Sequence, residues 1–197
     1  MPAMRATLDQ VDSLPLAERS EDRAVCVSMW AGLLERRPER VAAAAKLTAR
    51  TYFDDGAMPL RPKAWSLALA HRIAGKENLA RREWQAAEAV MRQRLKDEPA
   101  NETYQVELAI TLAWLEQREE AARLIGAVEP GWREEVKRSR QELLARYHAA
   151  AGDAAKVAAY LPAAIDRTVF MSRKVFPLDP WWDKVRDAPE FVAALKE

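Results

Sequence analysis

Short turn signals recur along a chain that is otherwise dominated by residues favouring α-helix. Ala, Leu, Glu, Arg and Gln fill most segments, and the 197 residues include only six glycines. The breaks combine Pro, Gly, Asp and Asn, which interrupt helices and form turns. This alternation predicts an all-α fold of about nine or ten helices, mostly in pairs. The breaks fall at 36–40, 54–62, 97–101, 128–132, 150–153 and 177–180.

The stretch 104–115, "YQVELAITLAWL", fits two periodicities. Val106, Leu108 and Ile110 alternate with other side chains, as a strand requires. Leu108 and Leu112, together with Tyr104, fit helical spacing equally well. The length of the stretch, its two alanines and its helix-forming flanks favour a helix. Because it is apolar on both faces, we expect that helix to be packed on both sides.

The bulk composition indicates a globular chain with no strong charge preference. Hydrophobic residues make up 49% and charged residues 31%, while 31 Lys and Arg balance 30 Asp and Glu to give a net charge of +1. A nucleic-acid or anionic-membrane partner usually requires a basic surplus, so neither is expected. No apolar run approaches the ~20 residues that span a bilayer. With no apolar signal-peptide core near the N-terminus, we expect a cytoplasmic protein or a piece of a longer one.

The sequence has few of the motifs and residues that catalysis or metal binding needs. The sequence has neither a G-x-x-x-x-G-K-[ST] phosphate loop nor a G-x-G-x-x-G motif. Its two histidines, His71 and His148, lie in different predicted hairpins, and its one cysteine, Cys26, has apolar neighbours typical of a core residue. The acidic pairs fall at turns and first helical turns, where carboxylates cap helices. We therefore expect no enzyme, no catalytic residue, no metal and no cofactor.

Helices in short-looped pairs prompt a search for internal repeats. The segments 74–101 and 108–130 share one form: a helix ends in a polar turn, and the next helix opens with acidic residues before a small residue. Ala87 and Ala121 take that place, 34 residues apart, which is the period of the tetratricopeptide repeat. Val157 takes it in a third segment, 36 residues further on.

Residues 68–101 resemble one tetratricopeptide unit. Gly75 matches the small residue that lets the paired helices approach, and Trp84 matches the aromatic residue at the turn. Ala87 matches the small residue of the second helix, and Pro99 the closing proline.

Two more units resemble the family less completely, and a first unit from about 22 is the weakest. His71 and Asn78 stand where the family usually has aromatic residues, and Pro130 arrives early. Pro162 is expected to interrupt the second helix of the last unit. The matching residues are Leu108, Ala109, Leu112, Ala121 and Ile125 in the unit from 102, and Leu144, Ala145, Gly152, Val157 and Leu161 in the unit from about 138.

The ending, "LDPWWDKVRDAPEFVAAL", resembles the closing segment of tetratricopeptide arrays in bacterial multidomain proteins. These include class III adenylate cyclases and winged-helix or kinase-linked signalling proteins. The matching residues are Leu178, Asp179, Pro180, Trp182, Asp183, Arg186, Pro189, Phe191 and Leu195.

The resemblance implies a right-handed α-superhelix of three to four helical hairpins with a C-terminal capping helix. It divides the chain into N-terminal helices with a degenerate first hairpin (1–62), repeats (63–176) and a cap (177–197).

The adjacent tryptophans, Trp181 and Trp182, have two readings: an exposed platform for a ligand, or a lid on the last hairpin. We favour the lid, because the last hairpin of an array needs an apolar cover with a polar outer side. Asp179 is expected to cap a turn with Pro180 in its first position, and Asp187 to start the final helix in a similar way. Phe191, Val192 and Leu195 would then share its buried face.

In tetratricopeptide arrays the first helix of each pair faces a concave groove, so the resemblance implies a groove that binds a peptide or partner protein. Its floor would be apolar, with cationic spots at Arg72, Lys76 and Arg146 that suit a peptide with apolar anchors and an acidic group. The implied groove residues are Leu69, Arg72, Lys76, Leu79, Thr103, Val106, Ile110, Ala113, Glu142 and Arg146.

The resemblance thus implies a non-enzymatic protein-interaction module. The alternative is a regulatory or sensory segment of a larger bacterial signalling protein, such as an adenylate cyclase or transcription regulator. The two differ in whether a catalytic or DNA-binding domain belongs to the same polypeptide. Neither the partner nor the oligomeric state follows from the sequence.

Overall fold

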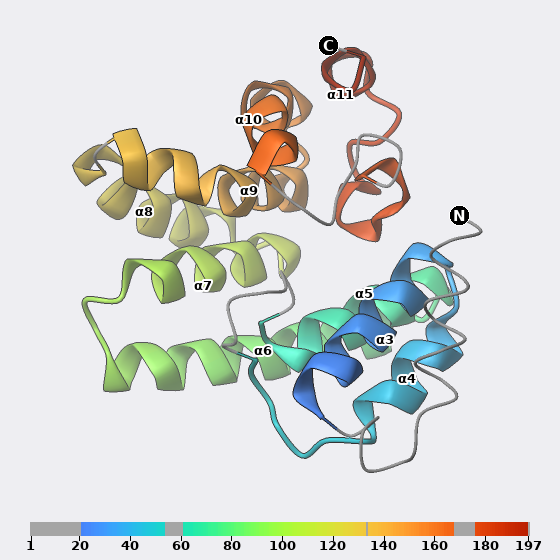
Figure 1. Ribbon diagram of the computed structural model, residues 1–197. Helices are drawn as coiled ribbons and strands as arrows, with labels where there is room; N and C mark the ends of the chain where they lie inside the picture. The colour runs from blue at the N-terminus through green and yellow to red at the C-terminus, as the bar shows by residue number, and fades with distance from the viewer. Residues whose placement is uncertain (1–20, 54–60, 133, 168–175, 197) are drawn as a thin grey trace. The chain divides into compact units, whose positions relative to one another are not determined.

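The protein is all-α, as the turn spacing predicts, with its helices packed in sequential pairs (Figure 1). The computed structural model describes residues 21–53, 61–132, 134–167 and 176–196. Part of the predicted N-terminal region, 1–20 and 54–60, lies outside these residues. Within them, the β structure is limited to one isolated bridge between Tyr52 and Pro62. The α-helices are α3 (Asp22–Leu34), α4 (Pro38–Ala45), α5 (Lys63–Ile73), α6 (Glu77–Asp97), α7 (Glu102–Trp114), α8 (Arg118–Val128), α9 (Glu134–Ala151), α10 (Ala154–Arg167) and α11 (Pro189–Ala194), with 3-10 turns η1 (Glu129–Gly131), η2 (Phe176–Leu178) and η3 (Pro180–Trp182).

The chain divides into two compact units, Met1–Val90 and Met91–Glu197, and the boundary falls inside α6. In the first unit α4 packs on α3, and α5 packs on both. In the second, α7 packs on α8 and α9, α9 on α10, and α10 on α11. The predicted cap therefore belongs to the same unit as the helices it contacts.

The ambiguous stretch 104–115 is helical, which confirms the prediction. It forms most of α7, whose N-terminus is capped by Asn101 accepting a hydrogen bond from the Tyr104 amide at 3.2 Å. Every residue from Val106 to Leu115 is buried. Because α7 packs against α8 on one side and α9 on another, a helix at this position needs apolar residues on more than one face.

Among the described residues, the same turn follows α3, α5, α7 and α9, the first helices of the sequential pairs α3–α4, α5–α6, α7–α8 and α9–α10. A residue with positive φ follows the helix, its amide bonds to the carbonyl three residues back, and the next amide bonds to the carbonyl five back. This is the Schellman motif, which satisfies the free carbonyls of a helix C-terminus. The hydrogen bonds that reach five residues back measure 2.7–2.9 Å from amide nitrogen to carbonyl oxygen. They run from Arg37 to Gly32, Lys76 to His71, Gln117 to Leu112 and Asp153 to His148.

These turns give the structural register of the repeat, and it differs from the predicted one. The positive-φ residues are Arg36, Gly75, Glu116 and Gly152, separated by 39, 41 and 36 residues. The last step equals the 36 residues predicted between Ala121 and Val157, but the step before it is 41 residues rather than the predicted 34. Five residues after them, in the same order, lie Val41, Ala80, Ala121 and Val157, each at most 1% exposed.

Ala80, and not Ala87, is thus the counterpart of Ala121. Ala87 is buried too, but it lies two turns further along α6. The sequence comparison missed this because α6 has 21 residues, ten more than α8, and offers a small residue in both turns.

The roles predicted for Gly75 and Trp84 also need correction. Gly75 lies in the turn at φ +69°, and a Cβ built there would have nothing within 4 Å, so its role is conformational. Gly32 is the residue at a close helix approach: a Cβ there would come within 2.9 Å of the Val41 side chain. Trp84 lies inside α6 rather than at a turn.

Pro162 does not interrupt its helix, contrary to prediction. The helix α10 continues through it to Arg167. Proline removes one backbone hydrogen bond from a helix interior. Leu161, next to Pro162, and Ile165, three residues later, are buried at 0% and 7% exposure, and burial of apolar side chains stabilises the helix.

Candidate functional site

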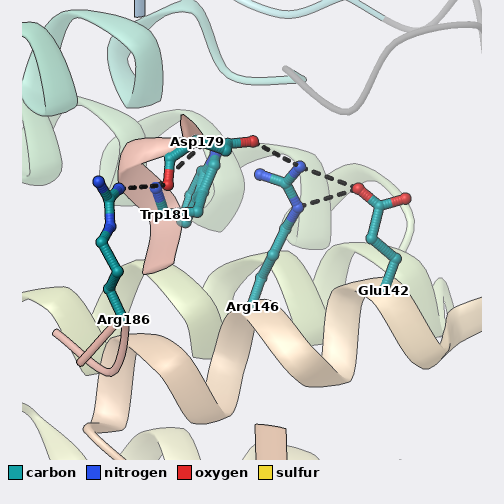
Figure 2. A network of polar contacts seen from close by, with 5 residues as sticks. All are labelled: Glu142, Arg146, Asp179, Trp181 and Arg186. Carbon is teal, nitrogen blue, oxygen red and sulfur yellow. Dashed lines mark hydrogen bonds and ion pairs between the residues drawn. The ribbon is translucent and has the colours of Figure 1, made fainter. Parts of the chain in front are cut away.

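One polar group of the second unit is centred on Arg146, a fully buried residue of α9 (Figure 2). Its Nε and Nη2 both donate to Glu142 Oε1, at 3.1 and 2.9 Å. Glu142 stands one turn earlier on the same helix, the spacing at which side chains meet. On the other side, Arg146 Nη2 lies 3.7 Å from Asp179 Oδ2, which comes from the loop before η3. The guanidinium is therefore held between two carboxylates from distant parts of the chain.

Two indole rings cover the same guanidinium. Its Cζ lies 4.7 Å from the centroid of the Trp181 ring and 6.0 Å from that of Trp182. A cation over an aromatic face is attracted by the ring quadrupole, and more strongly where water is excluded. Both tryptophans are 0% exposed. We call Glu142, Arg146, Asp179, Trp181 and Trp182 the Arg146 cluster.

The tryptophan pair is buried, as the lid hypothesis predicts, so it does not form an exposed platform. Trp182 stacks on Phe176 with ring centroids 4.6 Å apart, and Phe191 of α11 lies 6.0 Å away. Trp181 meets Trp114 of α7 edge to face at 6.1 Å. The aromatic rings thus tie the C-terminal segment, residues 176–196, into the core of the second unit.

Asp179 has two roles in the Arg146 cluster: it caps the turn η3 and it pairs with Arg146. Its Oδ1 accepts the Trp181 amide at 3.1 Å, with Pro180 in the first position of η3, as predicted. Its carbonyl accepts a hydrogen bond from Arg186 Nη2 at 3.1 Å. Burial raises the pKa of this carboxyl, although the neighbouring Arg146 charge acts in the opposite direction.

Lys184 fixes the segment at a second point. Its Nζ donates to the Ala150 carbonyl at 2.7 Å and lies 4.3 Å from the centroid of the Trp114 ring. Ala150 lies in the last turn of α9, where free carbonyls favour a cation. One side chain of the segment thus contacts both α7 and α9.

The last helix differs from prediction in two details. Its N-cap is Ala188 rather than Asp187, although Pro189 occupies the first position as expected. Val192 is 40% exposed, while Ala194 is buried with Phe191. Phe191 and Ala194 are three residues apart and share a face, whereas Val192 lies about 100° around the helix from Phe191.

The structure distributes the predicted groove residues between the core and the surface. Each of the two units holds some of them, and five are at most 2% exposed. The buried ones are Leu69, Val106, Ile110, Ala113 and Arg146, the half-buried ones Arg72, Thr103 and Glu142, and the exposed ones Lys76 and Leu79.

The five buried residues do not line an open groove. Leu69 is buried in α5, which packs on α3 and α4. Val106, Ile110 and Ala113 belong to α7, which lies between α8 and α9. Arg146 was predicted as a cationic spot for a ligand; the chain's own Asp179 and tryptophans occupy it instead.

Sequence reasoning missed the contacts that join the C-terminal segment to the helices. It identified Asp179 as a cap but not as a partner of Arg146, 33 residues earlier. No local pattern marks Trp114 or Lys184 as contacts. The adjacent tryptophans after an Asp-Pro turn were the available signal, and they indicated burial but not its location.

A second cluster of titratable side chains lies around His148, in the last turn of α9. Its ring lies parallel to that of Tyr160, with centroids 5.6 Å apart and planes at 4°, and meets Tyr147 edge to face at 4.8 Å. Tyr160 donates to Glu129 Oε1 at 2.8 Å. Asp153 Oδ2 lies 4.0 Å from His148 Nδ1.

Burial shifts the pKa values in this group. It lowers the pKa of His148, helped by the charge of Lys156 and opposed by Asp153 and Glu129. Burial and the hydrogen bond to Glu129 raise the pKa of Tyr160 to about 12. The neutral forms of both rings are therefore the ones that this packing favours.

Comparison of the chain with protein-family models, with curated proteins and with solved structures finds no match. Among the residues that the structure describes, no three His, Cys, Asp or Glu side chains gather as a metal would require. Across the same residues, no helix combines the length and apolar character needed to cross a membrane.

Proposed function

We propose that this protein is a non-enzymatic binding module of the tetratricopeptide type, which holds a peptide segment of a partner protein against the first helices of its pairs. The observation that carries this proposal is the way the second unit holds the C-terminal segment. The receiving residues Trp114, Arg146 and Ala150 all belong to first helices, α7 and α9. Aromatic anchors and a carboxylate paired with arginine are typical of peptide recognition.

The repeated turn supports the same proposal. Four helix pairs share one Schellman turn and one buried small or apolar position after it. Such equivalence is typical of helical-repeat proteins, whose stacked pairs present extended binding surfaces. We also propose that the stacked helix pairs form a right-handed superhelix.

For an external partner, the predicted positions that remain accessible in the first unit are Arg72, Lys76 and Leu79. Leu79 is 37% exposed and Lys76 is exposed, while Arg72 is half-buried and pairs with Glu77 at 3.0 Å. An apolar side chain with two cations close to it in the sequence suits a peptide with an apolar anchor and an acidic group.

The proposal is tested by affinity capture from the host's lysate with Arg72→Glu/Lys76→Glu beside wild type. The matched control is Arg81→Glu/Arg82→Glu, which changes the same charge at two exposed positions of α6 outside the predicted set. We expect a protein that wild type and the control retain and the first variant loses. Equal capture by all three, with folding verified by circular dichroism, would contradict this binding surface.

The alternative role, a regulatory segment of a larger signalling protein, stays a prediction. It would gain support if a catalytic or DNA-binding domain were found on the same polypeptide.

A further inference from the structure

The C-terminal segment contacts the helices in the manner of a bound peptide. It contains two 3-10 turns, η2 and η3, and the six-residue helix α11, so it adds no further long helical pair. Its contacts with α7 and α9 are made by individual side chains: Asp179, Trp181 and Lys184. The segment is therefore recognised by its sequence of anchors rather than by continuation of the repeat.

The anchors have the features of a binding hot spot. Asp179, Trp181 and Trp182 are at most 1% exposed, and together they surround the buried Arg146 guanidinium. Interfaces concentrate their energy in such buried aromatic side chains and desolvated charge pairs. The Asp179 cap to the Trp181 amide fixes the spacing between the carboxylate and the indoles.

The receiving surface has the complementary chemistry. Arg146 supplies the cation, Glu142 holds its guanidinium in place from one turn away, and Trp114 supplies an aromatic ring. The Ala150 carbonyl accepts from the lysine two residues after the tryptophan pair. A segment with a carboxylate, a proline, two tryptophans and a following lysine meets each of these groups.

We propose that the face formed by α7 and α9 is a peptide site for a short segment bearing a carboxylate followed by Pro-Trp-Trp, and that residues 176–196 fill it in cis. This inference rests on the proposed function and names the occupant of the site in the second unit. Because the occupant is part of the same chain, its effective concentration at the site is high, and an external peptide competes poorly. The site accepts a peptide in trans once the chain's own anchors are removed.

The test uses the full-length chain and a fluorescent synthetic peptide of residues 176–197. The receiving variant is Trp181→Ala/Trp182→Ala, which removes the cis anchors and leaves Arg146, Glu142 and Trp114 intact. We expect fluorescence anisotropy to show saturable binding to this variant, and binding to wild type weaker by about 100-fold, the lower end of such proximity effects. Val192→Ala, an exposed change in the same segment, should behave as wild type.

Two peptide variants test the chemistry. A peptide in which both tryptophans are alanine should not bind, and one with Asp179→Lys should lose at least about tenfold in affinity because it places a second cation beside Arg146. Tight binding of either altered peptide would overturn the assignment of anchors.

A milder receiving variant, Trp182→Phe, keeps an aromatic ring and covers the case in which the double variant does not fold. Excess peptide should raise its melting temperature and leave that of wild type unchanged. If neither variant gains affinity or thermal stability over wild type, the segment is not a separable ligand and the inference is wrong. The result is independent of the lysate capture, since it involves neither Arg72, Lys76 nor any host protein.

Discussion

Removing the Trp182 side chain should destabilise the second unit by about 3–5 kcal/mol, as truncation of large buried aromatic residues does. The ring is 0% exposed, stacks on Phe176 at 4.6 Å and contacts Phe191 at 6.0 Å. A buried indole removes roughly 150–250 Å² from water, which at about 25 cal/mol per Å² gives about 4–6 kcal/mol as an upper figure. The two routes agree that the Trp182→Ala change is large.

The measurement is urea unfolding followed by far-UV circular dichroism, for wild type, Trp182→Ala and Val192→Ala. Val192 lies in the same segment but is 40% exposed, so its truncation should change the free energy of unfolding by less than about 0.5 kcal/mol. If Trp182→Ala costs no more than this control, the ring is not part of the core, and the capping role of the segment fails with it.

Two other properties of the second unit give direct predictions. Glu116→Gly should stabilise the fold by about 0.5–1 kcal/mol, since Glu116 holds φ +66° at a turn where glycine is unstrained. Gly152→Ala should cost about 1 kcal/mol, because Gly152 holds φ +81° although the space around it is open. Denaturant unfolding measures both changes. Burial lowers the folded-state pKa of His148 below the unfolded value of 6.5. The stability that the neutral ring contributes is therefore fully present above pH 6.5 and is lost as pH falls through the folded pKa. His148→Phe, which keeps a ring against Tyr160, should flatten the decline in stability between about pH 7 and 5. An unaltered decline in the His148 variant would refute the linkage, and a stability loss in Glu116→Gly would refute the strain argument.

The structure confirms those sequence predictions that depend on short-range chemistry. The predicted breaks at 97–101 and 150–153 separate helices, and Asp179 and Pro180 begin their turn as expected. The apolar stretch of α7 is a helix in which every residue from Val106 to Leu115 is buried. In each case the relevant partners are a few residues away, so composition and spacing contain the information.

The repeat register shows where such reasoning fails. Two of the four positive-φ turn positions are Arg36 and Glu116, which no glycine marks, and the long helix α6 places small residues at both Ala80 and Ala87. A comparison of sequence periods selected the wrong one. The backbone conformation at the turn, which the sequence specifies only weakly, identifies the right one.

The sequence by itself determined an all-α chain of paired helices whose terminal tryptophans are buried, because helix propensity, turn chemistry and hydrophobicity act locally. The tertiary structure decided what those tryptophans cover. Arg146 appeared in the sequence as a surface cation on a helix, and it became a buried one when Asp179, 33 residues later, and two indoles packed over it. Whether a charge faces solvent or a partner depends on which distant segment folds across it, and that is a long-range property that no local pattern encodes.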